Sequence, residues 1–239
     1  MSHTTDGFHA VPQIDAVSPS LRDAIKQLLD SIPVDTGGGA SPLKALVLSD
    51  LIITQRLQLV IEIGVYRGRL LLPLALTAKS QGAGEVIGID PYSAQAAEQH
   101  DEHASPPLDL KAWPHAIDWD GLYAQINQAI ADNGIERWCR VMRTRSEDSA
   151  HLFPSGTIDL LHIDGNHDQA SVIRDVELYA PKVKVGGCVV LDDTSWASVW
   201  PVYRQLQATH ELVFHLFDCR GISMDGMGGN DFAIFRILD

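Results

Sequence analysis

Five short apolar runs alternate with helical segments along the middle of the chain, and this alternation constrains the fold more than any other feature. The runs span residues 57–65, 84–92, 138–145, 157–165 and 186–194, and glycine or polar turns bound each of them. Apolar strands separated by helices are typical of a parallel sheet that is covered on both faces. We therefore predict an α/β fold with five parallel strands and helices on both faces.

Two further apolar runs lie near the end of the chain, at residues 210–218 and 230–238, with a glycine-rich segment between them. Two strands joined in this way are expected to pair as an antiparallel hairpin. The predicted sheet therefore has seven strands, is mostly parallel and ends in a C-terminal antiparallel hairpin. This is a Rossmann-like architecture.

The rest of the chain divides into a leader, two helices and an insertion. We expect residues 1–18 to form a mobile leader and residues 19–239 to form a single domain, which begins with helices within 19–56. Ser41 is a suitable N-cap and Pro42 a suitable first residue for the second helix. Residues 93–117 contain two consecutive prolines and three histidines and interrupt the alternation. We interpret them as a lid over the site.

The chain is acidic, with 31 Asp and Glu against 18 Lys and Arg and a formal net charge of −13. A field of this sign disfavours nucleic acids and anionic membranes as partners. Neither a secretory leader nor an apolar stretch of membrane-spanning length is evident, so a cytoplasmic location is predicted. The three cysteines, Cys139, Cys188 and Cys219, are interpreted as reduced thiols. The oligomeric state stays open, a homo-oligomer included.

Open α/β sheets bind ligands at the carboxyl ends of their strands, and the first of these ends carries a glycine turn. The turn is Glu62–Gly68 (EIGVYRG), where Gly64 and Gly68 allow the backbone to approach a ligand closely. Tyr66 stands where a dinucleotide-binding motif needs its second glycine, so a dehydrogenase is disfavoured. The alternative is an ordinary tight turn between a strand and a helix.

Two polar residues follow the second and third strands. Asp90 ends the second strand, where its carboxylate can accept hydrogen bonds from both hydroxyls of a ribose. Its alternative role is a helix cap, but an acid after strand two beside a glycine turn after strand one favours nucleoside binding. Ser146 follows the third strand and can contact an adenine edge or cap the next helix.

Acidic residues are concentrated after the fourth and fifth strands. Asp164 ends the fourth run, and Asp192 and Asp193 end the fifth. Neighbouring strands lie about 4.8 Å apart, so these carboxylates repel each other unless a cation neutralises them. Oxygen ligands favour a hard ion such as Mg²⁺. The alternative is that the consecutive acids solvate a turn while Asp164 caps the following helix.

His167 lies three residues after Asp164, near the start of the next helix. A ring at this position can reach a substrate bound beside the acids and accept its proton, so His167 and Asp164 form the candidate catalytic pair. The alternative is that His167 is a surface residue.

The segment Glu62–Gly68 and Asp90, together with the predicted strand order, resemble the cofactor-binding half of class I methyltransferases over about residues 40–239. The three acids resemble the metal-dependent O-methyltransferases, both the catechol type and the type that methylates sugars of macrolide antibiotics. The catechol type has a lysine where this chain has His167, so the sugar-methylating type is the more similar. That type carries Glu-Asp in place of Asp192-Asp193, and this departure can change the preferred metal.

The resemblance implies S-adenosylmethionine (SAM) as cofactor and Mg²⁺ or Mn²⁺ as metal. The methionine part would lie at the glycine turn, the ribose at the acid after the second strand, and the adenine by the serine after the third. The implied cofactor-binding residues are Glu62, Gly64, Tyr66, Gly68, Asp90 and Ser146, and the implied metal ligands are Asp164, Asp192 and Asp193.

The function implied is a SAM-dependent and metal-dependent O-methyltransferase that acts on a small molecule, such as a vicinal diol of a sugar or natural product. The ion would hold two acceptor oxygens, His167 would take a proton, and the oxygen would attack the methyl group. Trp113, Trp119 and Trp196 would shape the acceptor pocket under the lid.

Three alternatives remain. A metal-independent N- or C-methyltransferase would use the acids to orient its acceptor. An Fe(II) oxygenase could use His162 and Asp164, which lie on one strand face, although such enzymes have antiparallel β architecture. A binding module could keep the fold without catalysis. The acceptor, the position methylated and the preferred metal do not follow from the sequence.

Overall fold

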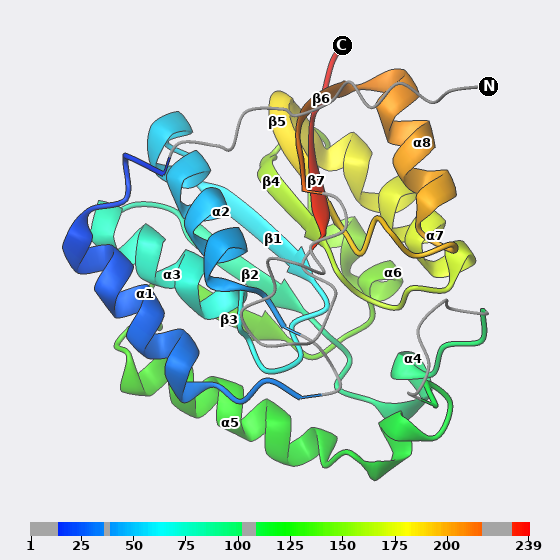
Figure 1. Cartoon of the computed structure of the whole chain (residues 1–239), viewed down its shortest axis with the longest axis horizontal. Helices are drawn as coiled ribbons and strands as arrows, with labels where there is room; N and C mark the ends of the chain where they lie inside the picture. Colours follow the sequence, from blue (N-terminus) through cyan, green and yellow to red (C-terminus); the bar gives the residue numbers. More distant parts are fainter. Residues whose placement is uncertain (1–13, 36–38, 102–108, 217–230) are drawn as a thin grey trace.

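The computed structural model describes residues 14–35, 39–101, 109–216 and 231–239. These residues form a seven-stranded sheet in the order β3-β2-β1-β4-β5-β7-β6 (Figure 1). The first five strands are parallel, while β7 runs antiparallel to both β5 and β6. The predicted mostly parallel sheet with a C-terminal hairpin is therefore confirmed. The strands are β1 (Leu59–Ile63), β2 (Glu85–Ile89), β3 (Cys139–Met142), β4 (Ile158–Ile163), β5 (Val183–Asp192), β6 (Glu211–Leu216) and β7 (Phe232–Arg236).

Helices cover both faces of the sheet (Figure 1). One face carries α1 (Pro19–Ser31), α2 (Pro42–Gln55), α3 (Leu71–Gln81) and α5 (Trp119–Asp132), and the other carries α7 (Gln169–Tyr179) and α8 (Trp200–Thr209). The first two helices begin where predicted, because the Ser18 and Ser41 hydroxyls accept hydrogen bonds from backbone N–H groups of the first turn. The short helices are α4 (Ala94–Ala97), η1 (Trp113–Ala116), α6 (Ser146–Ser149), η2 (Ala150–Leu152) and η3 (Ala180–Lys182).

Strand residues alternate between two apolar cores, one on each face. In β1, Val60 packs in the core under α2 and α3, whereas its neighbour Ile61 packs in the core under α7 and α8. Leu160 and Leu161 of β4 alternate in the same way. The period of two places Glu62, two residues after Val60, on the α2 face.

The carboxyl ends of β1 and β4 meet where the strand order reverses, which is the usual ligand site of such sheets. Gly64 has φ +86°, and a Cβ built on it would lie 1.9 Å from the backbone oxygen of Asp164. Four described non-glycine residues have positive φ, and Tyr66, Tyr92 and Asp193 among them follow strands at this edge. Such strained conformations gather at functional sites.

Contacts begin before the boundary expected for the leader. Val17 is buried, and the Ala16 N–H donates to the Asp50 carboxylate at 2.8 Å. Residues 1–13 lie outside the described residues, as do 102–108 of the insertion interpreted as a lid and Cys219. Within the described part of the chain, no helix is both long and apolar enough to cross a bilayer.

Candidate functional site

Asp90 holds the glycine turn through backbone hydrogen bonds. Its Oδ2 accepts from the N–H groups of Val65 and Tyr66, each at 3.0 Å, and its Oδ1 accepts from the Tyr92 N–H at 2.7 Å. Burial raises the pKa of Asp90, and the three N–H groups oppose this rise. The structure thus brings Asp90 beside the Gly64–Gly68 turn, as predicted. The carboxylate also builds the turn, which a helix cap would not do.

Tyr66 connects the turn to two other segments. Its hydroxyl donates to the Asp35 carboxylate at 3.0 Å, and Arg67 binds the same carboxylate at 2.8 Å. The Tyr66 ring packs against Trp113 and Trp119, with ring centroids 5.8 and 6.1 Å away. Burial and the Asp35 charge raise the pKa of Tyr66 to about 12, so the phenol keeps its proton. The ring of Tyr66 therefore joins the turn to the insertion.

Ser146 lies at the start of α6, next to a buried acid. Its hydroxyl donates to Asp175 at 2.5 Å, and the Tyr179 hydroxyl donates to the Ser146 carbonyl at 2.8 Å. Asp175 approaches the loop after β4, because its Oδ2 lies 3.5 Å from a Cβ built on Gly165. Burial raises the pKa of Asp175 to about 6. The predicted contact of Ser146 with adenine stays a prediction.

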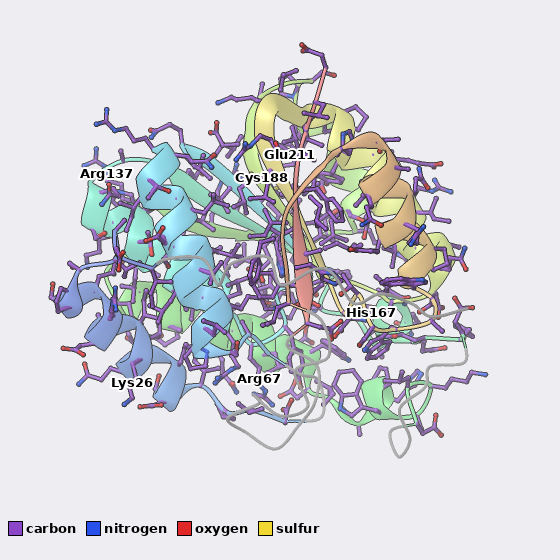
Figure 2. All side chains as sticks on the ribbon, turned by 45° about the horizontal axis from the view of Figure 1, so that its top comes forward. Lys26, Arg67, Arg137, His167, Cys188 and Glu211 are labelled. Carbon is purple, nitrogen blue, oxygen red and sulfur yellow. The ribbon has the colours of Figure 1, made fainter. Side chains whose placement is uncertain are left out.

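Asp164, His167 and Asp193 form one group at the carboxyl edge. His167 Nε2 lies 2.8 Å from Asp193 Oδ2 and 3.6 Å from Asp164 Oδ1. One ligand atom from each of the three side chains lies within 4.8 Å of the others. The Trp196 ring lies against the His167 ring, with centroids 4.6 Å apart. Figure 2 shows His167 at this edge and Cys188 and Glu211 toward the opposite end of the sheet.

A second charged group lies deeper, between the sheet and α2. Glu62 Oε1 lies 3.5 Å from His162 Nδ1, and His162 Nε2 lies 3.7 Å from Asp192 Oδ2. The same Asp192 oxygen binds the Lys44 ammonium. All four side chains are at least 96% buried. Glu62, predicted to bind cofactor, thus faces His162 inside the sheet, and its cofactor contact stays a prediction.

The pKa values in these groups reflect their partners. Burial favours a neutral Asp192, but the Lys44 and His162 charges outweigh burial and hold its pKa well below the usual range. Burial and the Asp192 charge raise the pKa of Asp164 to about 6. Burial opposes the charged form of His167, yet the Asp193 and Asp164 carboxylates raise its pKa to about 10. Asp192 is therefore the most firmly ionised of the three predicted metal ligands.

Burial likewise opposes the charged form of His162, but Asp192 and Glu62 raise its pKa to about 9. Burial raises the pKa of Glu62, and His162 opposes this rise. The histidine is thus the positive member of the deeper group beside Lys44.

The protein itself supplies cations between its acids. The sequence interpretation assumed that the acids after β4 and β5 would repel each other unless a metal neutralised them. In the structure, Lys44 binds Asp192, and His167 lies between Asp164 and Asp193. Mutual repulsion therefore does not by itself require a metal.

The donor set at the surface nevertheless fits a divalent cation. Asp164 and Asp193 present carboxylate oxygens close to His167, and their side chains are 26% and 14% exposed. Asp192 Oδ1 is buried without a hydrogen-bond partner among the described residues. Carboxylate oxygens of Asp164 and Asp193, together with the unpartnered Oδ1 of Asp192, are suitable ligands for Mg²⁺ or Mn²⁺ with water in the remaining positions.

The loop after β4 holds the first half of the insertion. The Asn166 amide donates to the carbonyls of Ala96 and Glu98 at 3.1 and 2.6 Å. Asp168 accepts from the N–H groups of His100 and Asp101 at 2.7 and 2.8 Å. These contacts flank His167 on both sides, so the insertion and the catalytic candidate form one structural unit.

Gln99 of the insertion also touches that unit, since its Nε2 lies 3.4 Å from His167 Nδ1. Its buried Oε1 has no hydrogen-bond partner among the described residues. If the Gln99 amide were rotated by 180°, its Oε1 instead of its Nε2 would lie next to His167 Nδ1 and could accept a hydrogen bond from it.

Sequence reasoning missed two residues of the site, Lys44 and Gln99. Lys44 had a signal, because it is the lone charged residue in the apolar helical segment PLKALVL at residues 42–48. A buried lysine needs a counter-charge, so this pattern predicts a buried acid as partner. Gln99 lies in a segment without periodicity, and no comparable signal points to it.

Comparison with known proteins gives the family context. A protein-family model described as a methyltransferase domain matches residues 61–194, which is more than half of the chain. No curated protein matches the sequence.

Several solved structures are similar in fold. The O-methyltransferase NovP aligns with a TM-score of 0.64 at 14% identity, over 92% of this chain and 98% of NovP. TomG from Streptomyces achromogenes, an O-methyltransferase involved in tomaymycin synthesis and solved with SAM, gives 0.58 at 12% identity over 93% and 91% of the two chains. An O-methyltransferase from Bacillus cereus, solved with SAH, gives 0.56 at 14% identity over 92% and 91%. At these identities the likeness shows a shared fold.

Proposed function

The chain belongs to the methyltransferase-domain family, which confirms the predicted enzyme class, and we propose that it transfers a methyl group from SAM to a hydroxyl of a small molecule. The observation that carries this proposal is the grouping of Asp164, His167 and Asp193 beside the Gly64–Gly68 turn. The proposed nucleoside site and the proposed proton-accepting site would then share one edge of the sheet, as methyl transfer to oxygen requires.

The glycine turn and Asp90 are proposed to bind SAM. When bound, SAM supplies a methyl group on a positively charged sulfur. A carboxylate has about four acceptor directions, and three of those of Asp90 are used by backbone N–H groups. We therefore expect Asp90 to accept from one ribose hydroxyl through Oδ1. Gly64, Tyr66 and Gly68 would line the site of the methionine part of SAM. Ser146 and Asp175 would lie near the adenine.

Metal dependence is the finer part of the proposal. Asp164 and Asp193, with the unpartnered Oδ1 of Asp192, would hold Mg²⁺ or Mn²⁺ near two neighbouring oxygens of the acceptor, which favours a vicinal diol or a catechol. When bound, the ion would lower the pKa of the acceptor hydroxyl. Asp164 is less acidic than a normal aspartate, so at low pH its proton competes with the ion.

His167 is proposed to accept the proton of the acceptor hydroxyl. Its ring is paired with Asp164 and Asp193, and this pairing raises the pKa of His167 and favours the protonated form. A cation at those carboxylates opposes that proton, because like charges repel. Ion uptake and proton loss from His167 are therefore coupled, and the neutral ring can act as a base. Trp196, stacked on the ring, restricts its orientation.

Methyl transfer to paired acceptors tests this function. The protein is incubated with SAM and Mg²⁺, with catechol and sugar diols as acceptors, and with the same molecules blocked at one hydroxyl as controls. We expect SAH and a mono-methylated product from the diols alone, and loss of both products in EDTA. Transfer that EDTA leaves unchanged would contradict metal dependence but keep the methyltransferase. Absence of SAM binding would contradict the proposal as a whole.

A metal-independent methyltransferase is the second candidate. The ion pairs that Lys44 and His167 form with the acids favour this candidate, because they balance the negative charge of the carboxylates without a metal ion. Persistent transfer in EDTA, to a nitrogen, carbon or isolated hydroxyl, would identify it.

A further inference from the structure

Asp175 is a buried acid on the inner face of α7 that takes no part in the proposed methyl transfer. It is buried together with Val172, Val176 and Tyr179 of the same helix. Among the described residues, the hydrogen bond that it receives comes from the Ser146 hydroxyl, which donates to Asp175 Oδ1 at 2.5 Å. Burying a carboxylate costs stability unless its partners compensate it, so a functional reason for this acid is expected.

The hydrogen bond to Asp175 fixes the direction in which Ser146 can donate. A hydroxyl has one hydrogen and two acceptor lone pairs, whereas an ionised carboxylate can only accept. Burial raises the pKa of Asp175 to about 6, so the carboxylate is still ionised at pH 7.5. The Ser146 hydrogen is therefore committed to Asp175, and the Ser146 oxygen is left as an acceptor.

Ser146 lies on the side of the edge where the base of a nucleoside bound at Asp90 is expected. It is the first residue of α6, which follows β3. The Asp90 N–H donates to the carbonyl of Met142 at the end of β3 at 3.1 Å, so the segment that leads to Ser146 starts beside the acid proposed to hold the ribose. The Tyr179 hydroxyl donates to the Ser146 carbonyl at 2.8 Å and holds the start of α6. Ser146 is partly exposed, so its oxygen can meet a ligand while its hydrogen stays on Asp175.

Adenine and hypoxanthine differ at the position that such an oxygen would read. Adenine carries a 6-amino group, which donates hydrogen bonds, whereas hypoxanthine carries a 6-oxo group, which accepts them. An oxygen that can only accept pairs with the amino group and is left facing a second acceptor by the oxo group. A site of this kind rejects the wrong base because a desolvated polar group loses its partner.

We propose that Asp175 makes Ser146 a dedicated acceptor for the 6-amino group of the cofactor base, so that the site selects 6-aminopurine nucleosides and rejects 6-oxopurine nucleosides. The inference rests on the proposed SAM site and deepens it. Asp175 acts through Ser146 and is therefore a positioning residue. A purely structural tie between α6 and α7 would not discriminate between the two bases.

Paired titrations with two forms of the reaction product test this role. SAH and S-inosylhomocysteine, in which oxygen replaces the 6-amino group, are titrated by calorimetry at pH 7.5. We expect the wild type to bind SAH at least about tenfold more tightly than S-inosylhomocysteine. The readout is how this ratio of Kd values changes in a variant, because any other group that reads the base contributes to both proteins alike.

Asp175→Leu is the deciding variant, because leucine has a similar size and no acceptor. The Ser146 hydrogen is then free to donate to a 6-oxo group. The ratio should fall about tenfold, and S-inosylhomocysteine should bind more tightly than it does to the wild type. Ser146→Ala should also lower the ratio, but through weaker binding of SAH.

Ser149→Ala is the matched control, because Ser149 is a buried serine of the same short helix and its hydroxyl lies 3.0 Å from the Tyr179 hydroxyl. Loosening of α6 should weaken both ligands equally and leave the ratio at its wild-type value. An unchanged ratio in Asp175→Leu would overturn the inference. If Asp175→Leu does not fold, Ser146→Ala decides, since an unchanged ratio there would overturn the inference as well.

A wild type that binds neither ligand would overturn both the proposed SAM site and this inference. A wild type that binds SAH and S-inosylhomocysteine equally well would overturn the inference alone and leave the methyltransferase.

Discussion

The two halves of the sheet's carboxyl edge hold their carboxylates by different means. On the β2 side, Asp90 is held by three backbone N–H groups. On the side of β4 and β5, the acids are held by a lysine and by histidines. Backbone groups keep their place and charge, whereas an imidazole can give up its proton to an ion or a solvent base. The first half thus suits a ligand of fixed shape, and the second suits an exchangeable ion and proton.

Replacing Gly64 should disrupt both parts of the carboxyl edge, because Gly64 contacts the backbone of Asp164 across the boundary between them. A Cβ there would lie 1.9 Å from the Asp164 carbonyl, at φ +86°. Gly64→Ala should lower the free energy of unfolding by about 3–5 kcal/mol and abolish SAM and Mn²⁺ binding. Urea unfolding measures the first effect and calorimetry the second.

Gly82→Ala is the control for backbone strain, since Gly82 has φ +64° but no atom within 4 Å of the added Cβ. Its loss should be about 1 kcal/mol. Equal losses in the two variants would show that the contact between the halves is unimportant.

The next prediction concerns only the part of the edge that follows β4 and β5. His167→Gln keeps a polar side chain but removes the proposed base, so the rate of methyl transfer should fall by about 10²–10⁴. SAM affinity should not change, because the proposed SAM site lies on the β2 side of the edge. His151→Gln, at an exposed histidine, is the control. A rate within a few-fold of the wild type would remove His167 from the mechanism.

Asp175 differs from the acids of both halves. Among its described contacts, neither a backbone N–H group nor a cation stabilises its negative charge. It accepts a hydrogen bond from Ser146, and burial raises its pKa to about 6. A carboxyl whose folded pKa is raised stabilises the protein at low pH and loses that contribution as pH rises through about 6. The shift of about two units corresponds to about 3 kcal/mol at most.

Asp175→Asn should therefore be more stable than the wild type at pH 7.5, and the difference should vanish near pH 4. Urea unfolding at both pH values measures it. Asp159 is the opposite control, because burial opposes its ionisation but Lys184 and two backbone N–H groups outweigh burial and hold its pKa below the usual range. Asp159→Asn should lose stability relative to the wild type at pH 7.5. A pH-independent effect of Asp175→Asn would contradict the account of its burial.

The strand ends could be predicted from the sequence because they depend on local patterns. The hydrophobic pattern and the turn residues located five parallel strands and the final hairpin. Because ligands bind at the carboxyl ends of such strands, Asp90, Asp164 and Asp193 could be predicted to lie at one edge. Glu62 was assigned to the cofactor turn, although the strand period already indicates an inward position under α2.

The inner ion pair could not be predicted in the same way. Lys44 and Asp192 are 148 residues apart, and only the packing of α2 on the sheet brings them together. Asp192 and Asp193 look equivalent as neighbours in sequence, yet the end of β5 sends their side chains to different groups. Local patterns locate acids along a strand, whereas the cation that each acid meets depends on tertiary structure.

The central claim is that one edge carries two separable sites, and titration of two variants tests it most directly. SAM is titrated in EDTA, and Mn²⁺ is titrated without SAM, into the wild type, Asp90→Asn and Asp164→Asn. We predict that Asp90→Asn loses SAM affinity at least about tenfold and keeps Mn²⁺, while Asp164→Asn loses Mn²⁺ and keeps SAM. Loss of both ligands in either variant, with the fold intact, would contradict the division of the edge into two sites.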